Sequence, residues 1–312
     1  MTPKQLFEYL IAKNTMTAPL MEKAIEACIT GSFTDAQIAV FLALMRMKGE
    51  TAEELSSAAL VMQRLAHKIN LGDNLIDIVG TGGDGANTFN VSTASSFVVA
   101  ACEIPVAKHG NRSVSSRSGS ADLLESAGFY LNLSDNQAQE CLSTCNLVFL
   151  FAPHYHPAMK QARVARQELG IKTLFNLLGP LINPAEAKKQ VIGVYSPKWL
   201  PSLSTVLIQL GSVHHLVISS QDGLDEISIT APTQVLEYKN GQHQEWQIDP
   251  KDYGLDHASI EDLVVDSPQQ SLDIILSVLS CQSNAARDMV VLNAAAAIYC
   301  ALETISYKEA IE

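Results

Sequence analysis

The most informative stretch of this 312-residue chain is Gly80-Thr81-Gly82-Gly83-Asp84-Gly85-Ala86-Asn87-Thr88-Phe89-Asn90-Val91-Ser92-Thr93. The apolar run 75–79 precedes it and predicts a buried strand, and a helical pattern from Thr93 to Cys102 follows it. A strand, a glycine-rich turn and a helix form a cradle for phosphate. Glycine lets the backbone approach a ligand, and the helix start supplies N–H groups and partial positive charge. The stretch matches neither the dinucleotide nor the P-loop fingerprint, and a tight turn without a ligand is the alternative interpretation.

A second polar run, residues 108–122, strengthens the case for a ligand site. It follows another short apolar strand, 104–107, and is rich in hydroxyls and cations. Loops of this length without structure of their own are usually functional. Because the two polar turns follow successive strands, we expect both at the carboxyl edge of one parallel sheet, where α/β proteins bind ligands.

The formal net charge of −12 argues against nucleic acid or an anionic membrane as the main partner. The same charge would repel a polyphosphate substrate. If the substrate is a polyphosphate, Lys108, Arg112 and Arg117 must offset this charge locally, and Mg²⁺ can supply the rest.

Targeting and redox features favour a cytoplasmic location. There is no apolar run long enough to predict a membrane span, and the N-terminus lacks the features of a signal peptide. Six scattered cysteines suggest no disulfide framework. Cys141 and Cys145 stand four apart on a predicted helix, which indicates one buried face more readily than half of a zinc site.

Residues 1–70 predict an all-helical domain. Pro19 stands early in one helix, and capping boxes at Thr34 and Thr51 open two more, the second running to about His67. Helices of this size cannot bury every apolar face by themselves. We expect the remainder to pack on a second copy of the chain, and packing on the rest of the same chain is the alternative.

From Leu75 the pattern changes to strand, loop and helix, which predicts an α/β domain over 75–312. Further strands are expected at 147–151, 190–195 and 212–218, with a helix at 201–210, a hairpin turn at 236–242 and two helices over 268–304. An excursion at about 155–185, with a helix from His156 to Gly170, interrupts this domain. The fold class is therefore α/β: a small N-terminal all-helical domain plus a large domain with a central, mostly parallel sheet.

Six blocks of sequence resemble the anthranilate phosphoribosyltransferase family in order and spacing. They are 80–84, 90–93, 108–116, 151–160, 175–184 and 222–226, and the resemblance covers nearly the whole chain. It implies the nucleoside phosphorylase/phosphoribosyltransferase fold class, a homodimer through the helical domain, and return of the 155–185 excursion to that domain. It also implies transfer of a phosphoribosyl group from 5-phosphoribosyl 1-diphosphate to anthranilate in tryptophan biosynthesis.

The resemblance implies that two loops bind the donor. The donor-binding positions are Gly80, Gly83, Asp84, Thr88, Asn90, Val91, Ser92, Thr93, Lys108, His109, Gly110, Asn111, Arg112, Ser113, Val114, Ser115, Ser116 and Ser120. For any single serine or threonine, capping of its own backbone is the competing interpretation.

The same resemblance implies which residues hold the metal and which bind the acceptor. Ser92, Asp225 and Glu226 would hold Mg²⁺, against the alternative of a solvated turn at 225–226. Gly80, Asn111 and Arg166 would bind anthranilate, with the Arg166 fork on its carboxylate and helix-surface solvation as the alternative. His109, His154 and Pro180 would line the acceptor channel. No catalytic base is expected, because an aromatic amine is already neutral at pH 7.

This sequence departs from the family pattern at Ala165, where proline is common, and at Lys172, where arginine is usual. The family also runs a further short helix or two past Glu312. Two rivals share the architecture: a pyrimidine-nucleoside phosphorylase and a non-catalytic nucleic-acid-binding relative. The acidic charge and the two donor loops favour the transferase.

Overall fold

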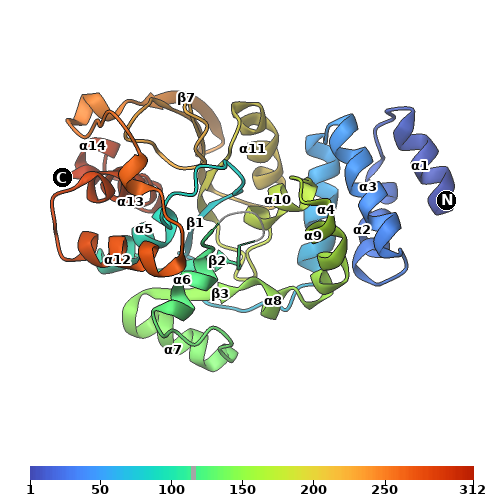
Figure 1. Cartoon of the computed structure of the whole chain (residues 1–312), viewed down its shortest axis with the longest axis horizontal. Helices are drawn as coiled ribbons and strands as arrows, with labels where there is room; N and C mark the ends of the chain where they lie inside the picture. The colour runs from blue at the N-terminus through green and yellow to red at the C-terminus, as the bar shows by residue number, and fades with distance from the viewer. Residues whose placement is uncertain (114–116) are drawn as a thin grey trace.

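The computed structural model describes residues 1–113 and 117–312, and its first four helices form a layer at one end of the molecule (Figure 1). They are α1 (Pro3–Ile11), α2 (Ala18–Ile29), α3 (Asp35–Lys48) and α4 (Ala52–Arg64). The predicted capping boxes are confirmed: Thr34 Oγ1 accepts from the Gln37 N–H, Thr51 Oγ1 accepts from the Glu54 N–H, and both partner side chains reach back. Gly49 ends α3 as predicted, with φ at 88°.

The strands of the described residues form a seven-stranded sheet in the order β3-β2-β1-β4-β5-β6-β7. They are β1 (Ile76–Gly80), β2 (Val106–Gly110), β3 (Leu147–Phe151), β4 (Lys189–Gly193), β5 (His214–Ser220), β6 (Thr233–Lys239) and β7 (Gln242–Ile248). β1 to β5 are parallel, whereas β6 and β7 are antiparallel, so the mostly parallel sheet is confirmed. The predicted hairpin turn joins β6 to β7 through Asn240 and Gly241, with φ values of 53° and 79°.

Both faces of the sheet are covered, because alternate residues of each central strand pack on opposite sides. Val191 and Leu216 lie in a cluster with α5 (Val91–Ala101) and α13 (Ala285–Ala301). Ile192 and Val217 lie in a second cluster with α11 (Leu200–Gln209) and α4. This accounts for the continuous apolar runs in the sequence and fixes the sheet as a rigid support.

The polar run 108–122 is not one loop, which corrects the expectation for its first residues. Lys108, His109 and Gly110 extend β2, with Lys108 opposite Phe149 of β3, and α6 (Ser120–Ser126) takes up the end of the run. Lys108 and His109 are 3% and 4% exposed. Polar residues fit inside this strand because buried acceptors meet them, as the Lys108 Nζ bond to the Ile78 carbonyl shows at 2.6 Å.

The predicted helix from His156 to Gly170 is wrong as a single element. The chain forms α8 (Ala152–Tyr155), a 3₁₀ helix over Pro157–Ala162, and α9 (Arg163–Leu169), followed by α10 (Leu174–Leu178). Pro157 explains the break, because the residue before a proline avoids the helical conformation and His156 has φ −123° and ψ 60°. Ala162, Ala165 and Leu174 share a hydrophobic cluster with α1–α4, so this excursion packs on the helical layer (Figure 1).

The remaining described α-helices lie around the α/β part. They are α7 (Asp135–Cys145), α12 (Pro268–Leu279) and α14 (Tyr307–Ile311), and α12 and α13 are the two helices predicted over 268–304. The Cys145 thiol donates to the Cys141 carbonyl within α7, and no metal-binding group of three or more His, Cys, Asp or Glu occurs in the described ranges. Nor does any described helix have the length and apolar character needed to cross a bilayer.

Candidate active site

The site forms where the strand order reverses, between the adjacent strands β1 and β4. The glycine turn that follows β1 and the segment that follows β4 leave the sheet at this point, and Gly80 is opposite Gly193 in the register. Asp225 lies over both glycines: a Cβ at Gly80 would overlap its carboxylate, and a Cβ at Gly193 would overlap its backbone carbonyl. The Gly82 N–H donates to Asp225 Oδ2 at 2.6 Å. Ligands of open α/β sheets bind at such a switch point, and the residues that meet here, 80–85, 193 and 225–226, are called the candidate crevice.

This packing makes Gly193 a strict requirement. Gly193→Ala is expected to lower the free energy of unfolding by roughly 1–3 kcal/mol, because the backbone of Asp225 must move to make room. Urea unfolding measures the change. Gly179→Ala is the control, since nothing lies within 4 Å of a Cβ there. A Gly193→Ala protein as stable as the control would contradict this close approach.

Three carboxylates share the crevice. Burial raises the pKa of Asp225 well above its ordinary value, and neighbouring Asp84 and Glu226 raise it further. Burial also raises the pKa of Glu226 to about 7, against the opposing effects of Lys108 and of hydrogen bonds from Ser92. The described residues thus gather carboxyl groups whose ionised forms are disfavoured by burial and by one another, and a bound cation would favour their ionisation.

Lys108 is the buried cation beneath this cluster. Its Nζ donates to the Ile78 carbonyl at 2.6 Å and to Ser92 Oγ at 3.2 Å. Burial lowers the pKa of Lys108, while Asp77 and Glu226 oppose that shift. Lys108 therefore fixes Ser92 at the start of α5 and partly balances the acids.

A divalent cation suits this donor set. Mg²⁺ favours hard oxygen ligands, few carboxylates from the protein, and oxygens from water or substrate phosphates. The Asp225 and Glu226 carboxylates with the Ser92 hydroxyl supply oxygens of this kind. The burial of these acids next to one another, which raises the pKa of both, is the observation that favours such an ion.

Two buried histidines, His109 and His156, contact each other and have fixed tautomers. His109 Nδ1 lies 3.2 Å from the Gly179 carbonyl and His156 Nε2 lies 2.9 Å from the Ile182 carbonyl, so each of these nitrogens must carry its proton. The rings are 5.2 Å apart. His109 Nε2 and His156 Nδ1 are left as buried acceptors that have no hydrogen-bond partner in the described structure.

This burial gives the protein a pH-dependent stability. Burial lowers the pKa of His156 to about 4 and that of His109 to about 3, with His156 adding to the second shift. A lowered histidine pKa contributes stability above the unfolded value of about 6.5, and this contribution is lost as the pH falls toward the folded value. As the pH falls from 6.5 to 5, His156 should therefore lower the free energy of unfolding by about 2 kcal/mol.

His156→Gln should therefore flatten the fall in unfolding free energy over this range, as urea titrations at several pH values would measure. Exposed His67 provides the control through His67→Gln. Asp77 acts in the opposite sense. Burial raises its pKa from 3.8 to about 6, so its contribution to the free energy of unfolding is lost as the pH rises through that range. An unchanged pH slope in His156→Gln would contradict the assignment of a buried neutral ring.

The predicted donor residues of the glycine turn and the α5 start fall into two groups. Gly83 and Asp84 border the crevice, whereas the Val91 and Thr93 side chains are buried in the interior. Thr88 forms an isolated antiparallel β-bridge with Val264.

Asn90 is engaged by the protein itself. Its Nδ2 donates to the Ser118 carbonyl at 3.1 Å, and its Oδ1 accepts from Ser118 Oγ at 2.7 Å and Ser271 Oγ at 2.8 Å. The side chain of Asn90 therefore has a structural role in this state, because its polar atoms bond to Ser118 and Ser271.

The second loop is held by acids. Arg112 pairs with Glu125 and, at 3.5 Å, with Asp122, and Arg117 pairs with Asp266. Ser113 N–H donates to Asp122 at 2.9 Å. Ser120 Oγ donates to the Asn111 carbonyl at 3.2 Å, close under Gly110. Val114, Ser115 and Ser116 lie outside the described residues.

Arg166 on α9 is a desolvated cation. Burial lowers its pKa, its guanidinium carbon lies 5.5 Å from the centroid of the Phe175 ring, and it forms no ion pair with any carboxylate of the described residues. Arg163, three positions earlier, is exposed. The two arginines of this helix therefore differ in exposure, because Arg166 is half-buried and Arg163 is exposed.

Three site residues were missed from sequence. Asp77 accepts from the His109 N–H at 3.2 Å and from Asn183 Nδ2 at 2.8 Å, and Asn183 also donates to the Ala107 carbonyl at 2.8 Å. This network fastens the excursion to β1 and β2 and sets the backbone of His109. Gly193 is the third. The charged residue inside an otherwise apolar strand was the available signal for Asp77.

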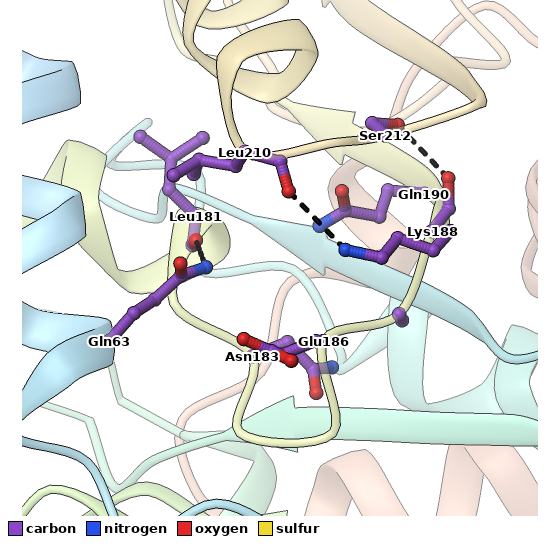
Figure 2. Close-up of a pocket in the computed structure, with 9 residues that line it drawn as sticks. Gln63, Leu181, Asn183, Glu186, Lys188, Gln190, Leu210 and Ser212 are labelled. Atoms are coloured by element: carbon purple, nitrogen blue, oxygen red, sulfur yellow. Dashed lines mark hydrogen bonds between the residues drawn. The ribbon is translucent and has the colours of Figure 1, made fainter. Parts of the chain in front are cut away.

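A separate small pocket lies at the opposite edge of the sheet, where β4 begins (Figure 2). Gln63 of α4 donates to the Leu181 carbonyl at 3.2 Å. Lys188 Nζ donates to the Leu210 carbonyl at 3.3 Å, and Ser212 Oγ donates to the Lys188 carbonyl at 3.0 Å. The polar groups of this pocket thus form hydrogen bonds with one another and connect α4 to the sheet. Neither Asp84, Asp225 nor Glu226 lines it.

Two family models match the chain. The model described as the helical bundle domain of a glycosyl transferase family matches residues 4–66, and the model described as its a/b domain matches residues 72–312. The fold and the acidic crevice thus define a glycosyl transferase with a helical bundle and a large α/β part.

Relatives and solved structures narrow this class. Anthranilate phosphoribosyltransferase of Legionella pneumophila (strain Paris) is 66% identical over 312 residues, which are 100% of this chain and 91% of the relative. The crystal structure of the Thermus thermophilus enzyme of that name has a TM-score of 0.89 at 35% identity, covering 98% of this chain and 92% of that one. The chain belongs to the anthranilate phosphoribosyltransferase family.

The Saccharomyces cerevisiae enzyme of the family is solved in complex with PRPP (5-phosphoribosyl 1-diphosphate) and Mg, with a TM-score of 0.88 at 27% identity over 99% of this chain and 91% of that one. It is also solved with 4-fluoroanthranilate, with a TM-score of 0.86 at 25% identity over 99% and 92% of the two chains. These complexes identify a donor, a metal and an acceptor analogue for that enzyme.

Proposed function

We propose that this chain transfers the phosphoribosyl group of 5-phosphoribosyl 1-diphosphate to anthranilate, giving N-(5-phosphoribosyl)anthranilate and diphosphate in tryptophan biosynthesis. The position of Asp225, over Gly80 and Gly193 and beside Asp84 and Glu226, is the observation that carries the proposal. It puts acids and a glycine turn at the switch point of the sheet, where a diphosphate and its metal can bind together. Family membership supports the same reaction.

On the donor side, the turn 80–85 would bring backbone N–H groups to the diphosphate. Gly82, Gly83 and Gly85 have positive φ values of 68°, 80° and 82°, which give this turn its shape. Lys108 would hold Ser92 in place through its 3.2 Å hydrogen bond. Asp225, Glu226 and Ser92 would hold Mg²⁺, which when bound supplies positive charge to the leaving diphosphate.

On the acceptor side, Arg166 would bind the anthranilate carboxylate. A half-buried guanidinium that has no carboxylate partner among the described residues leaves its planar fork free for one, and such pairs are bidentate. Gly80 and Asn111 would contribute further contacts. His109 Nε2 is a buried acceptor suited to an amine N–H, and Pro180 and His154 would border the approach.

The reaction needs no catalytic base from the protein. The lone pair of an aromatic amine is available at neutral pH, so the difficult step is departure of diphosphate from C1 with the bonding electron pair. Attack from the opposite face would invert C1. Closure of the helical layer on the α/β part would exclude water, which otherwise captures the sugar cation.

The wider setting is also proposed. The helical layer, residues 1–70 with the 155–185 excursion, would act as one domain against 75–312. It exposes Ile11, Val40 and Met47 at 59%, 42% and 76%, and we propose that these side chains pack in a homodimer.

Each of the cysteines Cys28, Cys102, Cys141, Cys145, Cys281 and Cys300 is free, which suits the reducing cytoplasm. The net charge of −12 favours neither nucleic acid nor membrane as a partner.

A product assay tests the reaction. Purified protein with 5-phosphoribosyl 1-diphosphate, anthranilate and Mg²⁺ should form N-(5-phosphoribosyl)anthranilate and diphosphate in equal amounts, as chromatography would measure. Parallel incubation with inorganic phosphate and a pyrimidine nucleoside tests the phosphorylase alternative. Phosphorolysis without phosphoribosyl transfer would contradict the proposal.

A further inference from the structure

Lys172 bridges the helical layer and the glycine turn. Its backbone carbonyl accepts from Arg46 Nη1 in the last turn of α3, which ties this residue to the helical layer. Its side chain crosses to the α/β part, where Nζ lies 3.7 Å from the centroid of the Tyr195 ring. The stem covers Gly83: a Cβ there would lie 2.8 Å from Lys172 Cε. Gly83 therefore makes room for this side chain as well as shaping the turn.

The ammonium of Lys172 faces the acidic cluster, and no carboxylate of the described residues pairs with it. Partial burial lowers its pKa, while Asp84 and Asp225 oppose that shift and Arg46 adds to it. Within the described ranges it forms no ion pair at 4.0 Å or less, in contrast to Lys48, which lies 2.7 Å from Glu54. The Tyr195 ring holds the cation near the acids rather than against one of them.

A cation held in this way is available to an anion that enters from solvent. The neighbouring acids would be engaged by Mg²⁺ in the proposed function, which leaves the ammonium to the substrate. Its position over the turn 80–85 places it on the side where backbone N–H groups meet the donor. A neutral side chain of similar length would fill the same space between Gly83 and Tyr195, so packing alone does not require a charge here.

We propose that Lys172 is a ligand of the donor's diphosphate group and stabilises the charge that develops as this group leaves. This inference rests on the proposed function. When the C1–O bond breaks, the electron pair stays with diphosphate, and the ammonium of Lys172 binds the resulting anion without giving up a proton. Because Arg46 fixes the same residue from the helical layer, donor binding also draws the two parts of the molecule together.

Lys172→Met tests the role of the charge, since it keeps an apolar stem between Gly83 and Tyr195. Calorimetric titration with diphosphate and Mg²⁺ should show roughly tenfold or greater weakening, the usual size for loss of a charge-assisted hydrogen bond. The kcat/KM for the donor should fall by a similar factor, with the KM for anthranilate and the urea midpoint little changed. Lys172→Arg should restore diphosphate binding to within about threefold, because a guanidinium also binds phosphate and also stacks on an aromatic ring.

The matched control is Lys198→Met. Lys198 Nζ lies 4.7 Å from the centroid of the Trp199 ring, so this change removes the same kind of contact elsewhere on the surface, and diphosphate affinity should stay within about twofold. If Lys172→Met binds diphosphate like wild type while the wild type forms product, the inference is overturned and the proposed function stands. A loss of stability that Lys172→Arg does not repair also overturns it, in favour of a packing role. If the wild type neither binds diphosphate with Mg²⁺ nor forms product, the proposed function fails and the inference fails with it.

Discussion

Asp225→Ala is expected to lower kcat/KM by roughly 10²-fold or more, the usual size of a lost electrostatic contribution to a transition state. The carboxylate lies at the switch point, accepts from the Gly82 N–H at 2.6 Å, and is buried beside Asp84 and Glu226. Its removal takes away both a proposed metal ligand and the acceptor that holds the glycine turn. Steady-state kinetics over a range of Mg²⁺ concentrations measure the effect.

Two further variants separate these contributions. Asp225→Asn keeps an oxygen for the Gly82 N–H and should lose most of the rate if the charge matters. Asp252→Ala changes an exposed carboxylate far along the chain and should leave turnover as it is. Wild-type turnover by Asp225→Ala at limiting Mg²⁺ would refute the metal assignment.

Arg166→Ala is expected to raise the KM for anthranilate by about 10- to 100-fold and to leave donor binding unchanged. The guanidinium is half-buried over Phe175 without an ion-pair partner among the described residues, so a carboxylate ligand would gain a partly dehydrated, bidentate contact. Initial rates at varied anthranilate, together with calorimetric titration of the donor, measure the two effects separately.

Arg163→Ala is the matched control, because Arg163 belongs to the same short helix and its side chain is exposed. It should leave both KM values near those of wild type. If Arg166→Ala weakened the donor and spared anthranilate, the carboxylate role would be wrong.

Local features of the fold were predictable because the signals are local. The capping boxes at Thr34 and Thr51 each lie within four residues, and the turn at Asn240 and Gly241 needs only its own φ values. The break at Pro157 was missed, although a proline is also a local signal, because the apolar pattern continued through it.

The core of the site depends on contacts that no local pattern contains. Asp225 meets both Gly80 and Gly193 only because β1 and β4 are neighbours, and the switch point follows from strand order rather than from either segment alone. Lys108 was expected in a loop because it is charged. The structure places it inside β2, since Ile78, Ser92 and Asp77 surround it with acceptors and opposite charge.

The central claim is that Asp225 and Glu226 hold a divalent ion against the donor's diphosphate at the switch point of the sheet. A crystal grown with 5-phosphoribosyl 1-diphosphate and Mn²⁺ in place of Mg²⁺ tests it directly through anomalous scattering. The account predicts an anomalous peak bonded to both carboxylates and to diphosphate oxygens, with the turn 80–85 around them. An ion and diphosphate bound elsewhere, or carboxylates turned away into solvent, would contradict it.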